Sequence, residues 1–333
     1  MPRLKALAML SLATLFVPAF AEGTNQARPG TLNYIEGQAT LDGQLLTAQS
    51  VGHTEIAPGQ TITTESGKVE VLLTPGVFLR LGDNSAVTMV SPNLTKTEIQ
   101  LDRGHAEIEV DQIYKQNDLL VDQGPAQTKI LQNGLYAFDA TAGDIRVFDG
   151  KAAVSPSTGA EKWITVKGGH ELALNGEPAK TKDFNRDQAA KQDALYSWSE
   201  LRSQYLGSAN LSLAEQYAGA PGFYPGWFWD PALYSYTWLP GDGLFWNPFG
   251  YGFYSPYYLY AGGFIYPGYG FRGGFYRGGY AYRGGYGFRG GAVRGASAPA
   301  ARGFAGGGFS GGGFHGGGGG FSGGSHGGGG GRR

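Results

Sequence analysis

The 333-residue chain contains no cysteine. It can therefore form no disulfide, bear no lipid on an N-terminal cysteine and perform no thiol chemistry. A domain without disulfides must obtain its stability from its own hydrophobic core. About 150 residues can bury enough apolar surface to build such a core.

Motifs of the common catalytic and metal sites are also missing. The five histidines are scattered, at positions 53, 105, 170, 315 and 326, and match no metal-ligand spacing. No Gly-x-Ser-x-Gly occurs, and the C-terminal glycine runs lack the strand and the Gly-Lys-Ser/Thr of a phosphate loop. We therefore predict no catalytic, cofactor-binding or metal-binding residue, and a protein that is not an enzyme.

The charge of the chain is unevenly distributed. Residues 243–333 contain no Asp, Glu or Lys, but they hold eight arginines and 36 of the 59 glycines. Because the whole chain has a formal charge of −1, residues 1–242 have a charge of −9. The sequence thus predicts an acidic globular part joined to a basic, Gly-rich tail, with different roles for the two.

The first 21 residues have the pattern of an export signal. Arg3 and Lys5 precede the apolar run Ala6–Val17, and Ala19-Phe20-Ala21 matches a small-x-small cleavage site. No later apolar run approaches the roughly 18–20 residues that a transmembrane helix needs. We expect cleavage after residue 21, no membrane-spanning segment in the mature chain, and a location in the periplasm, at the cell surface or outside the cell.

Short runs of β-branched and apolar residues dominate residues 31–177. Turn residues such as Pro75-Gly76 and Asn133-Gly134 separate them at intervals too short for helices. The clearest runs are Thr61–Thr64, Val69–Leu73 and Val77–Leu81. The pattern predicts an all-β domain of about fourteen short strands, arranged as a solenoid-like or sandwich-like stack.

The run His105–Val110 alternates strictly between apolar and polar residues. This period of two predicts a strand with one face in the core and the other in water. We expect Glu107 and Glu109 to lie together on the solvated face, and not as two opposed carboxylates across a cleft.

One helix is predicted at residues 184–207. Asn185 is a suitable N-cap, with Gln188 three residues further on, and Gly207 is a suitable stop. Trp198 is the expected anchor of the helix on the β-domain. The predicted inward stripe consists of Leu195, Trp198, Leu201, Arg202 and Tyr205.

The order of the strand and turn motifs resembles the periplasmic FecR domain. The motifs are Gly59-Gln60-x-Ile62-x-Thr64, Gly67-Lys68-Val69-Glu70-Val71, Pro75-Gly76-Val77-Phe78-Leu79-Arg80-Leu81, Leu101-x-x-Gly104-His105-Ala106-Glu107 and Val147-x-x-Gly150-Lys151-Ala152-x-Val154. The resemblance implies a compact stack of short strands and a location in the cell envelope.

Two departures from the family limit what the resemblance implies. Gly134-Leu135-Tyr136 stands where the family usually has Gly-Thr-x-Phe. FecR regulators of iron uptake also have an anti-sigma segment and a transmembrane helix before the domain, where this chain has an export signal. The sigma-regulating role is therefore not transferred.

Residues 217–265 are rich in aromatic residues, Pro and Gly, which forbid a long helix. We expect irregular, partly ordered chain packed on the β-domain or on a partner. Trp and Tyr rings also stack on sugar rings, so ligand binding is the alternative to local packing. The candidate contact residues are Trp227, Trp229, Trp238 and Trp246.

Residues 266–333 repeat an aromatic-Arg-Gly-Gly unit and then become almost pure glycine, a composition typical of disorder. Such repeats bind RNA in cytosolic proteins, but export argues against a nucleic-acid partner. Weak, multivalent adhesion to anionic envelope polymers and a solvated spacer are the two interpretations left open. The arginines concerned are Arg272, Arg277, Arg283 and Arg289.

The leading hypothesis is a non-enzymatic, exported envelope protein in which a FecR-like β-domain serves as a binding or scaffolding module and the tail is adhesive. Its partner would be an envelope protein or polysaccharide, and self-association stays open. The alternatives are a periplasmic signalling module that docks a membrane partner, and a carbohydrate-binding envelope protein.

Overall fold

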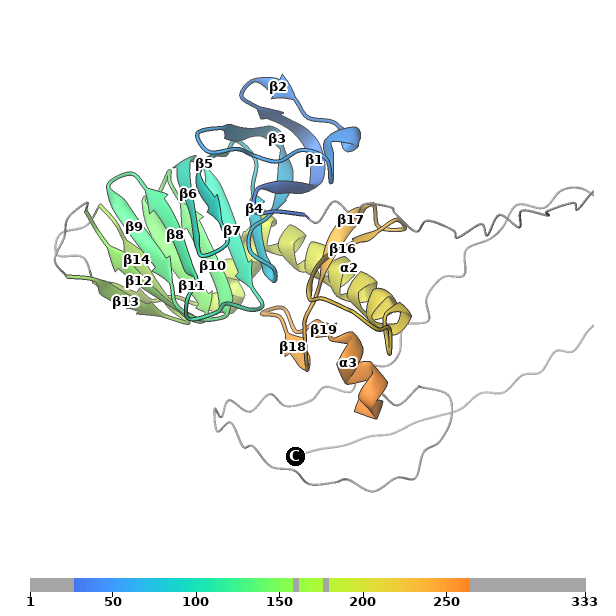
Figure 1. Cartoon of the computed structure of the whole chain (residues 1–333). Coiled ribbons are helices and arrows are strands. Elements are labelled where there is room, and N and C mark those ends of the chain that lie inside the picture. The colour runs from blue at the N-terminus through green and yellow to red at the C-terminus, as the bar shows by residue number, and fades with distance from the viewer. Residues whose placement is uncertain (1–26, 158–161, 176–179, 264–333) are drawn as a thin grey trace, which may run out of the picture. The chain divides into compact units, whose positions relative to one another are not determined.

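The computed structural model describes residues 27–157, 162–175 and 180–263 (Figure 1). The chain divides into two compact units, Met1–Phe271 and Arg272–Arg333, and every described residue belongs to the first. The predicted export signal and the predicted disordered tail, residues 266–333, lie outside the described residues.

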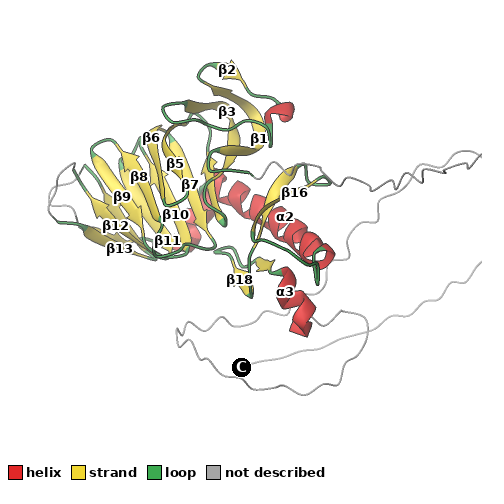
Figure 2. Ribbon diagram, viewed as in Figure 1, coloured by secondary structure: helices red, strands yellow, loops and turns green. Residues whose placement is uncertain are grey.

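Strands dominate the described part, which confirms the all-β prediction (Figure 2). Fifteen of them form one sheet. These are β1 (Thr31–Leu41), β2 (Gln44–Leu45), β3 (Thr61–Leu72), β4 (Val77–Leu81), β5 (Ala86–Asn93), β6 (Lys96–Arg103), β7 (His105–Val110), β8 (Asp118–Gln123), β9 (Ala126–Ile130), β10 (Gly134–Asp139), β11 (Asp144–Asp149), β12 (Lys151–Ser155), β13 (Ile164–Lys167), β14 (His170–Ala173) and β15 (Thr181–Asp183).

The long strand β3 connects the two parts of this sheet. Its first residues, Thr61–Thr63, pair with β5, and Val69–Leu72 pair with β4. From β5 the sheet continues through β6, β8, β9, β12 and β13, and from β4 through β7, β10, β11, β14 and β15. All of these pairs are antiparallel except β6 with β8.

Gly37 of β1 and Gly67 of β3 lie opposite each other where the pairing of these two strands shifts in register. Gly37 has a φ of 73°, and a Cβ atom there would lie 2.2 Å from the Ser66 carbonyl oxygen. The shift therefore needs glycine both for its backbone angle and for space.

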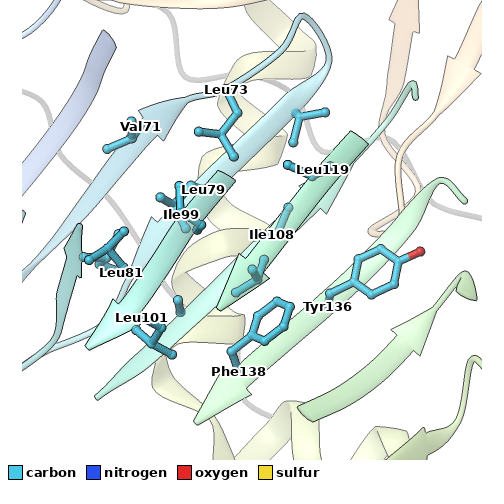
Figure 3. Packing of buried hydrophobic residues seen from close by; sticks show 14 of the residues in the cluster. Val71, Leu73, Leu79, Leu81, Ile99, Leu101, Ile108, Leu119, Tyr136 and Phe138 are labelled. Atoms are coloured by element: carbon cyan, nitrogen blue, oxygen red, sulfur yellow. The ribbon is translucent and has the colours of Figure 1, made fainter. Parts of the chain in front are cut away.

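The main hydrophobic core lies between the two parts of the sheet (Figure 3). Alternate residues of each strand point into it, as the period of two predicts. Leu79 of β4, Ile108 of β7 and Ile99 of β6 meet there with Tyr136 and Phe138 of β10, and all five are at most 2% exposed. Burial of one such side chain stabilises the fold by roughly 1.5–3 kcal/mol.

Two helices follow the sheet where one was predicted. They are α1 (Arg186–Gln192) and α2 (Ala194–Gln216). The described residues also form three short helical turns elsewhere, namely η1 (Ala48–Ser50), α3 (Pro256–Tyr258) and η2 (Leu259–Gly263). Asn185 caps α1 as predicted, since its Oδ1 accepts a hydrogen bond from the Gln188 amide at 3.0 Å. Asp193 ends α1 and caps α2, because its Oδ1 accepts from the Leu195 amide at 2.8 Å.

The predicted helix stop at Gly207 is wrong, because α2 continues to Gln216. Gly207 is buried in the middle of the helix, where a Cβ atom would lie 3.3 Å from the Tyr251 Cβ. This glycine therefore allows a close approach to the following chain and does not end the helix. None of the helices in the described ranges has the length and apolar content needed to cross a bilayer.

The aromatic segment is more regular than predicted and forms two hairpins. They consist of β16 (Gly226–Asp230) with β17 (Ser235–Leu239), and β18 (Leu244–Trp246) with β19 (Gly252–Tyr254). The Pro residues of the described segment stand outside the strands, whereas Gly226 and Gly252 are the first residues of β16 and β19. Within the strands the aromatic residues pair across the ladder, as Trp227 does with Trp238.

Candidate functional site

One side of β3, β4 and β7 bears charged residues and is covered by α2 and the aromatic hairpins. We call it the covered face; its charged residues are Glu70, Arg80, Glu107 and Glu109. The expectation that Glu107 and Glu109 face water is wrong, because they are only 1% and 0% exposed. Strand alternation does turn them away from the core, but α2 then buries them.

Two arginines and two glutamates form a buried charge network on the covered face. Arg80 Nε donates to Glu70 Oε2 at 2.9 Å, and Arg80 Nη1 donates to Glu109. Arg202 of α2 donates through Nη2 to the other oxygen of Glu70 at 2.8 Å. This charge network ties α2 directly to the sheet.

Uncharged side chains complete the shell of the charge network. Asn33 Nδ2 of β1 donates to Glu70 at 2.8 Å, and Asn247 Nδ2, just after β18, donates to Glu109 at 2.8 Å. The Ser203 hydroxyl also donates to Glu109. Asn33 further binds the backbone N–H and carbonyl of Tyr236, at 2.7 and 3.0 Å. The network thus joins four strands of the sheet, β1, β3, β4 and β7, to α2 and to both hairpins.

The two arginines keep Glu70 ionised although it is buried. Burial alone would raise the pKa of Glu70, but the charges and hydrogen bonds of Arg202 and Arg80 lower it to about 2. Burial likewise favours the neutral form of Arg80, yet Glu109 and Glu70 outweigh it and raise the pKa of that guanidinium. Each charge is therefore stabilised by the opposite charges around it.

Two further carboxyl groups lack this compensation. Burial and the charge of Asp193 raise the pKa of Glu107 to about 8, despite the nearby Ser199 hydroxyl. Burial and Glu109 raise the pKa of Asp111 well above its usual range. Within the described part of the chain, no oxygen of Glu107 or Asp111 has a hydrogen-bond partner of good geometry. Glu107 is therefore expected to be neutral at pH 7.

A polar groove of about 640 Å³ opens beside the covered face, between the sheet and α1. On the sheet side, Arg146 of β11 binds Glu171 Oε2 through Nε and Asp144 Oδ2 through Nη2, both at 3.1 Å. His105 Nδ1 lies 3.3 Å from Asp139 Oδ2. On the helix side the lining is Asn185, Gln188, Ala189, Gln192, Asp193 and Leu195.

The four candidate tryptophans do not form one surface. Trp227 and Trp238 are buried in a cluster with Phe78, Leu206 and Phe253, so local packing accounts for both. Trp229 is half-buried, and its ring fills the space where a Cβ of Gly52 would lie. Trp246 of β18 is 64% exposed. The four candidate arginines, Arg272, Arg277, Arg283 and Arg289, lie outside the described residues.

The charge network was not foreseen from the sequence, although one signal of it was present. Arg202 falls inside the apolar stripe that predicted the inward side of the helix. A charged residue at a buried position needs a partner of opposite charge. Glutamates at alternate positions of otherwise apolar strands are the natural candidates.

The fold defines an all-β domain whose charged side is closed by a C-terminal helix and two hairpins. The family model described as FecR protein matches residues 60–155, which are the strands from β3 to β12. This part of the chain is a FecR domain, as the resemblance implied. Asn33, Arg202 and Asn247 lie outside the match but complete the charge network.

Two crystal structures of a proposed anti-sigma factor from Parabacteroides distasonis, at 2.50 and 1.65 Å resolution, are similar to part of the chain. Each shares 14% sequence identity with it at a TM-score of 0.34. The similarity covers 39% of this chain and 62% of the other, which is less than two thirds of that protein. No curated protein matches the chain.

Proposed function

We propose that the chain is a non-enzymatic binding and scaffolding protein of the bacterial cell envelope, with an envelope polysaccharide as its ligand. The FecR domain and the export pattern of residues 1–21 support the location. The FecR domain serves as the rigid base, and the second aromatic hairpin serves as the contact surface.

The observation that carries the proposal is an aromatic face on β18 and β19, on which Trp246 is 64% exposed and the other side chains are half-buried. We define the aromatic face as Leu244, Trp246, Tyr254 and Tyr258. Leu244 pairs with Tyr254 and Trp246 with Gly252, so these side chains share one side of the hairpin. The Tyr254 and Tyr258 rings lie 6.4 Å apart, centre to centre. Aromatic rings with polar tips are suited to stacking on sugar rings.

The aromatic face is fixed from behind by the interior of the protein. On the opposite side of β18, the ring of Phe245 packs edge-on against Trp238, with 5.1 Å between ring centres. Asn247, the next residue after Trp246, donates to buried Glu109. A surface held in this way loses little conformational entropy on binding, which favours affinity.

Trp246→Ala in the full mature chain tests the proposal by co-sedimentation with purified cell-wall polysaccharide. We expect the variant to bind at least about tenfold more weakly, because stacked aromatic anchors contribute about 1–3 kcal/mol or more. Trp163→Ala is the matched control, since Trp163 is also exposed, at 43%, but lies before β13. Equal binding by Trp246→Ala and the wild type would refute the polysaccharide ligand.

The basic tail would add weak adhesion to the same envelope polymers. A truncated chain that ends at Phe271, the boundary between the two compact units, tests this contribution. The truncation retains both hairpins, and we expect it to move from the envelope fraction to the soluble fraction. Unchanged partitioning would mean that the tail acts as a spacer.

A signalling module that docks a membrane partner is the second candidate, and the FecR domain itself favours it. Such docking would have to use a surface other than the covered face, because α2 and the hairpins occupy that face. Cross-linking in intact envelopes distinguishes the two functions. Capture of one membrane protein by both the wild type and Trp246→Ala would favour signalling.

A further inference from the structure

A small hollow adjoins the groove beside α1. The hollow is about 10 Å³, room for about one water-sized group. His105, Arg146, Asp193 and Leu195 line both the groove and the hollow, so the two adjoin. Buried Glu107 lies in the lining of the hollow alone.

Of the four acids around the hollow, Glu107 alone makes no hydrogen bond or ion pair of good geometry within the described chain, and the nearby Ser199 hydroxyl does not supply one. Asp139 pairs with His105, Asp144 pairs with Arg146, and Asp193 caps α2. Glu107 is 1% exposed, and neither of its oxygens accepts a hydrogen bond of good geometry. Because a buried carboxyl without a partner is unfavourable, a group that satisfies it gains binding strength from doing so.

The chemistry of the hollow selects a small cationic donor. Its four acids outnumber Arg146 and His105, the only basic residues in its lining. Glu107 has a free acceptor oxygen when protonated and accepts through both oxygens when ionised, so a group that donates hydrogen bonds suits it in either form. A primary ammonium group is about the size of water, has three N–H donors and is positively charged. The groove outside is wide enough for an attached aliphatic chain, along Leu195 and Ala189.

We propose that this groove binds a primary ammonium group, with the nitrogen in the hollow between Glu107 and Asp193 and the aliphatic chain beneath α1. The amine can belong to a free polyamine-type molecule or to a lysine side chain of a partner. This site is separate from the aromatic face and does not depend on the polysaccharide ligand.

Binding must be linked to the release of a proton. Without ligand, Glu107 holds its proton at pH 7, because its pKa is about 8. An ammonium ion in the hollow favours the carboxylate, so the proton passes to solvent. The charged groups around it are His105 and Asp139, Arg146 and Asp144, Asp193 between α1 and α2, and Arg80 and Glu109 on the covered face.

Isothermal titration calorimetry on the full mature chain tests the proposal at pH 7, with 1,4-diaminobutane and with a lysine-containing peptide as probes. Titration in two buffers of different ionisation enthalpy counts the protons released. We expect saturable binding of at least one probe, with close to one proton released. Saturation by the diamine identifies a free amine as sufficient, whereas binding of the peptide alone identifies a partner's lysine.

Glu107→Gln keeps the shape of the side chain and removes its charge. We expect this variant to bind at least about tenfold more weakly and to release no proton. Glu200→Gln is the matched control, because Glu200 is an exposed glutamate of α2 outside the groove lining, and it should bind as the wild type does. If neither probe binds, or if Glu107→Gln binds as the wild type, the hollow holds only a trapped water and the proposal is overturned.

Discussion

Arg202 of α2 donates a hydrogen bond of 2.8 Å to Glu70 of β3, a residue 132 positions earlier in the chain. Both side chains are buried, at 4% and 0% exposed. Removal of Glu70 would leave Arg202 as an uncompensated buried charge, and removal of Arg202 would leave Glu70 with Arg80 as its one charged partner among the described residues. The FecR domain and the C-terminal helix are therefore coupled in folding, although only the former lies in the family match.

We expect Arg202→Met to lower the free energy of unfolding by about 3–5 kcal/mol. The methionine fills much of the same space, but Glu70 keeps only Arg80 as a charged partner. Urea denaturation followed by tryptophan fluorescence measures the change. A loss below about 1 kcal/mol would show that the contact between Arg202 and Glu70 is not needed for stability.

The double variant Arg202→Met with Glu70→Gln separates pairing from packing. The double variant removes the Arg202 and Glu70 charges together, so neither is left buried without the other. We therefore expect it to lose less unfolding free energy than the sum of the losses of the two single variants. Strict additivity would mean that the two residues act independently.

The sequence was sufficient to predict the strands and a helix anchored on them by Trp198, but not which side of the strands the helix buries. Period-two patterns reveal which side of a strand is apolar, and the core around Leu79 and Ile108 follows directly from them. They cannot reveal that Ser203 of α2, 94 residues later in the chain, covers Glu109. That burial depends on pairing between distant charges, which leaves no local pattern.

The candidate site was predicted only in part for the same reason. Tryptophan content predicted that the aromatic segment packs locally or binds a ligand, but the strand register decides which rings are buried and which are exposed. Trp238 points inward and Trp246 outward, and a segment interrupted by Pro and Gly gives no register before the hairpins are known. The groove at Glu107 combines residues from several strands and both helices, so no sequence motif represents it.

Replacing Glu107 by Gln is expected to stabilise the protein at neutral pH by about 1–3 kcal/mol. The pKa of Glu107 is raised from 4.5 to about 8 in the folded state. The contribution of Glu107 to the free energy of unfolding is therefore fully present below pH 4.5 and is lost as the pH rises toward 8. Glutamine does not ionise and avoids that loss.

Unfolding free energies measured between about pH 5 and pH 8 check this prediction. The wild type should lose more stability across the range than Glu107→Gln, whereas the exposed control Glu200→Gln should behave as the wild type does. Parallel pH curves for the wild type and Glu107→Gln would contradict the raised pKa.

Glu70 should produce the opposite pH dependence, on the acid side. Its pKa falls from 4.5 to about 2 on folding, so its contribution is fully present above pH 4.5 and is lost as the pH falls toward 2. The difference between the two pKa values corresponds to about 3 kcal/mol of unfolding free energy. Denaturation at about pH 6 and pH 3 should show a smaller acid loss in Glu70→Gln than in the wild type. An equal loss would assign the acid sensitivity to other carboxylates.

The register shift between β1 and β3 gives a prediction that is independent of charge. Gly37→Ala combines a positive φ of 73° with a Cβ only 2.2 Å from the Ser66 carbonyl oxygen, which belongs to the backbone and cannot move aside. Gly43 has a similar φ of 81°, but no atom lies within 4 Å of its Cβ position. The left-handed backbone angle alone costs a residue with a Cβ about 1–2 kcal/mol, so Gly43→Ala should lower the free energy of unfolding by that amount. Gly37→Ala should lower it by at least twice as much, because the Cβ also meets the backbone. Thermal and urea denaturation of the two variants measure the difference. Equal losses would show that β1 can shift away from β3 without cost, and that the paired glycines are not what fixes the register.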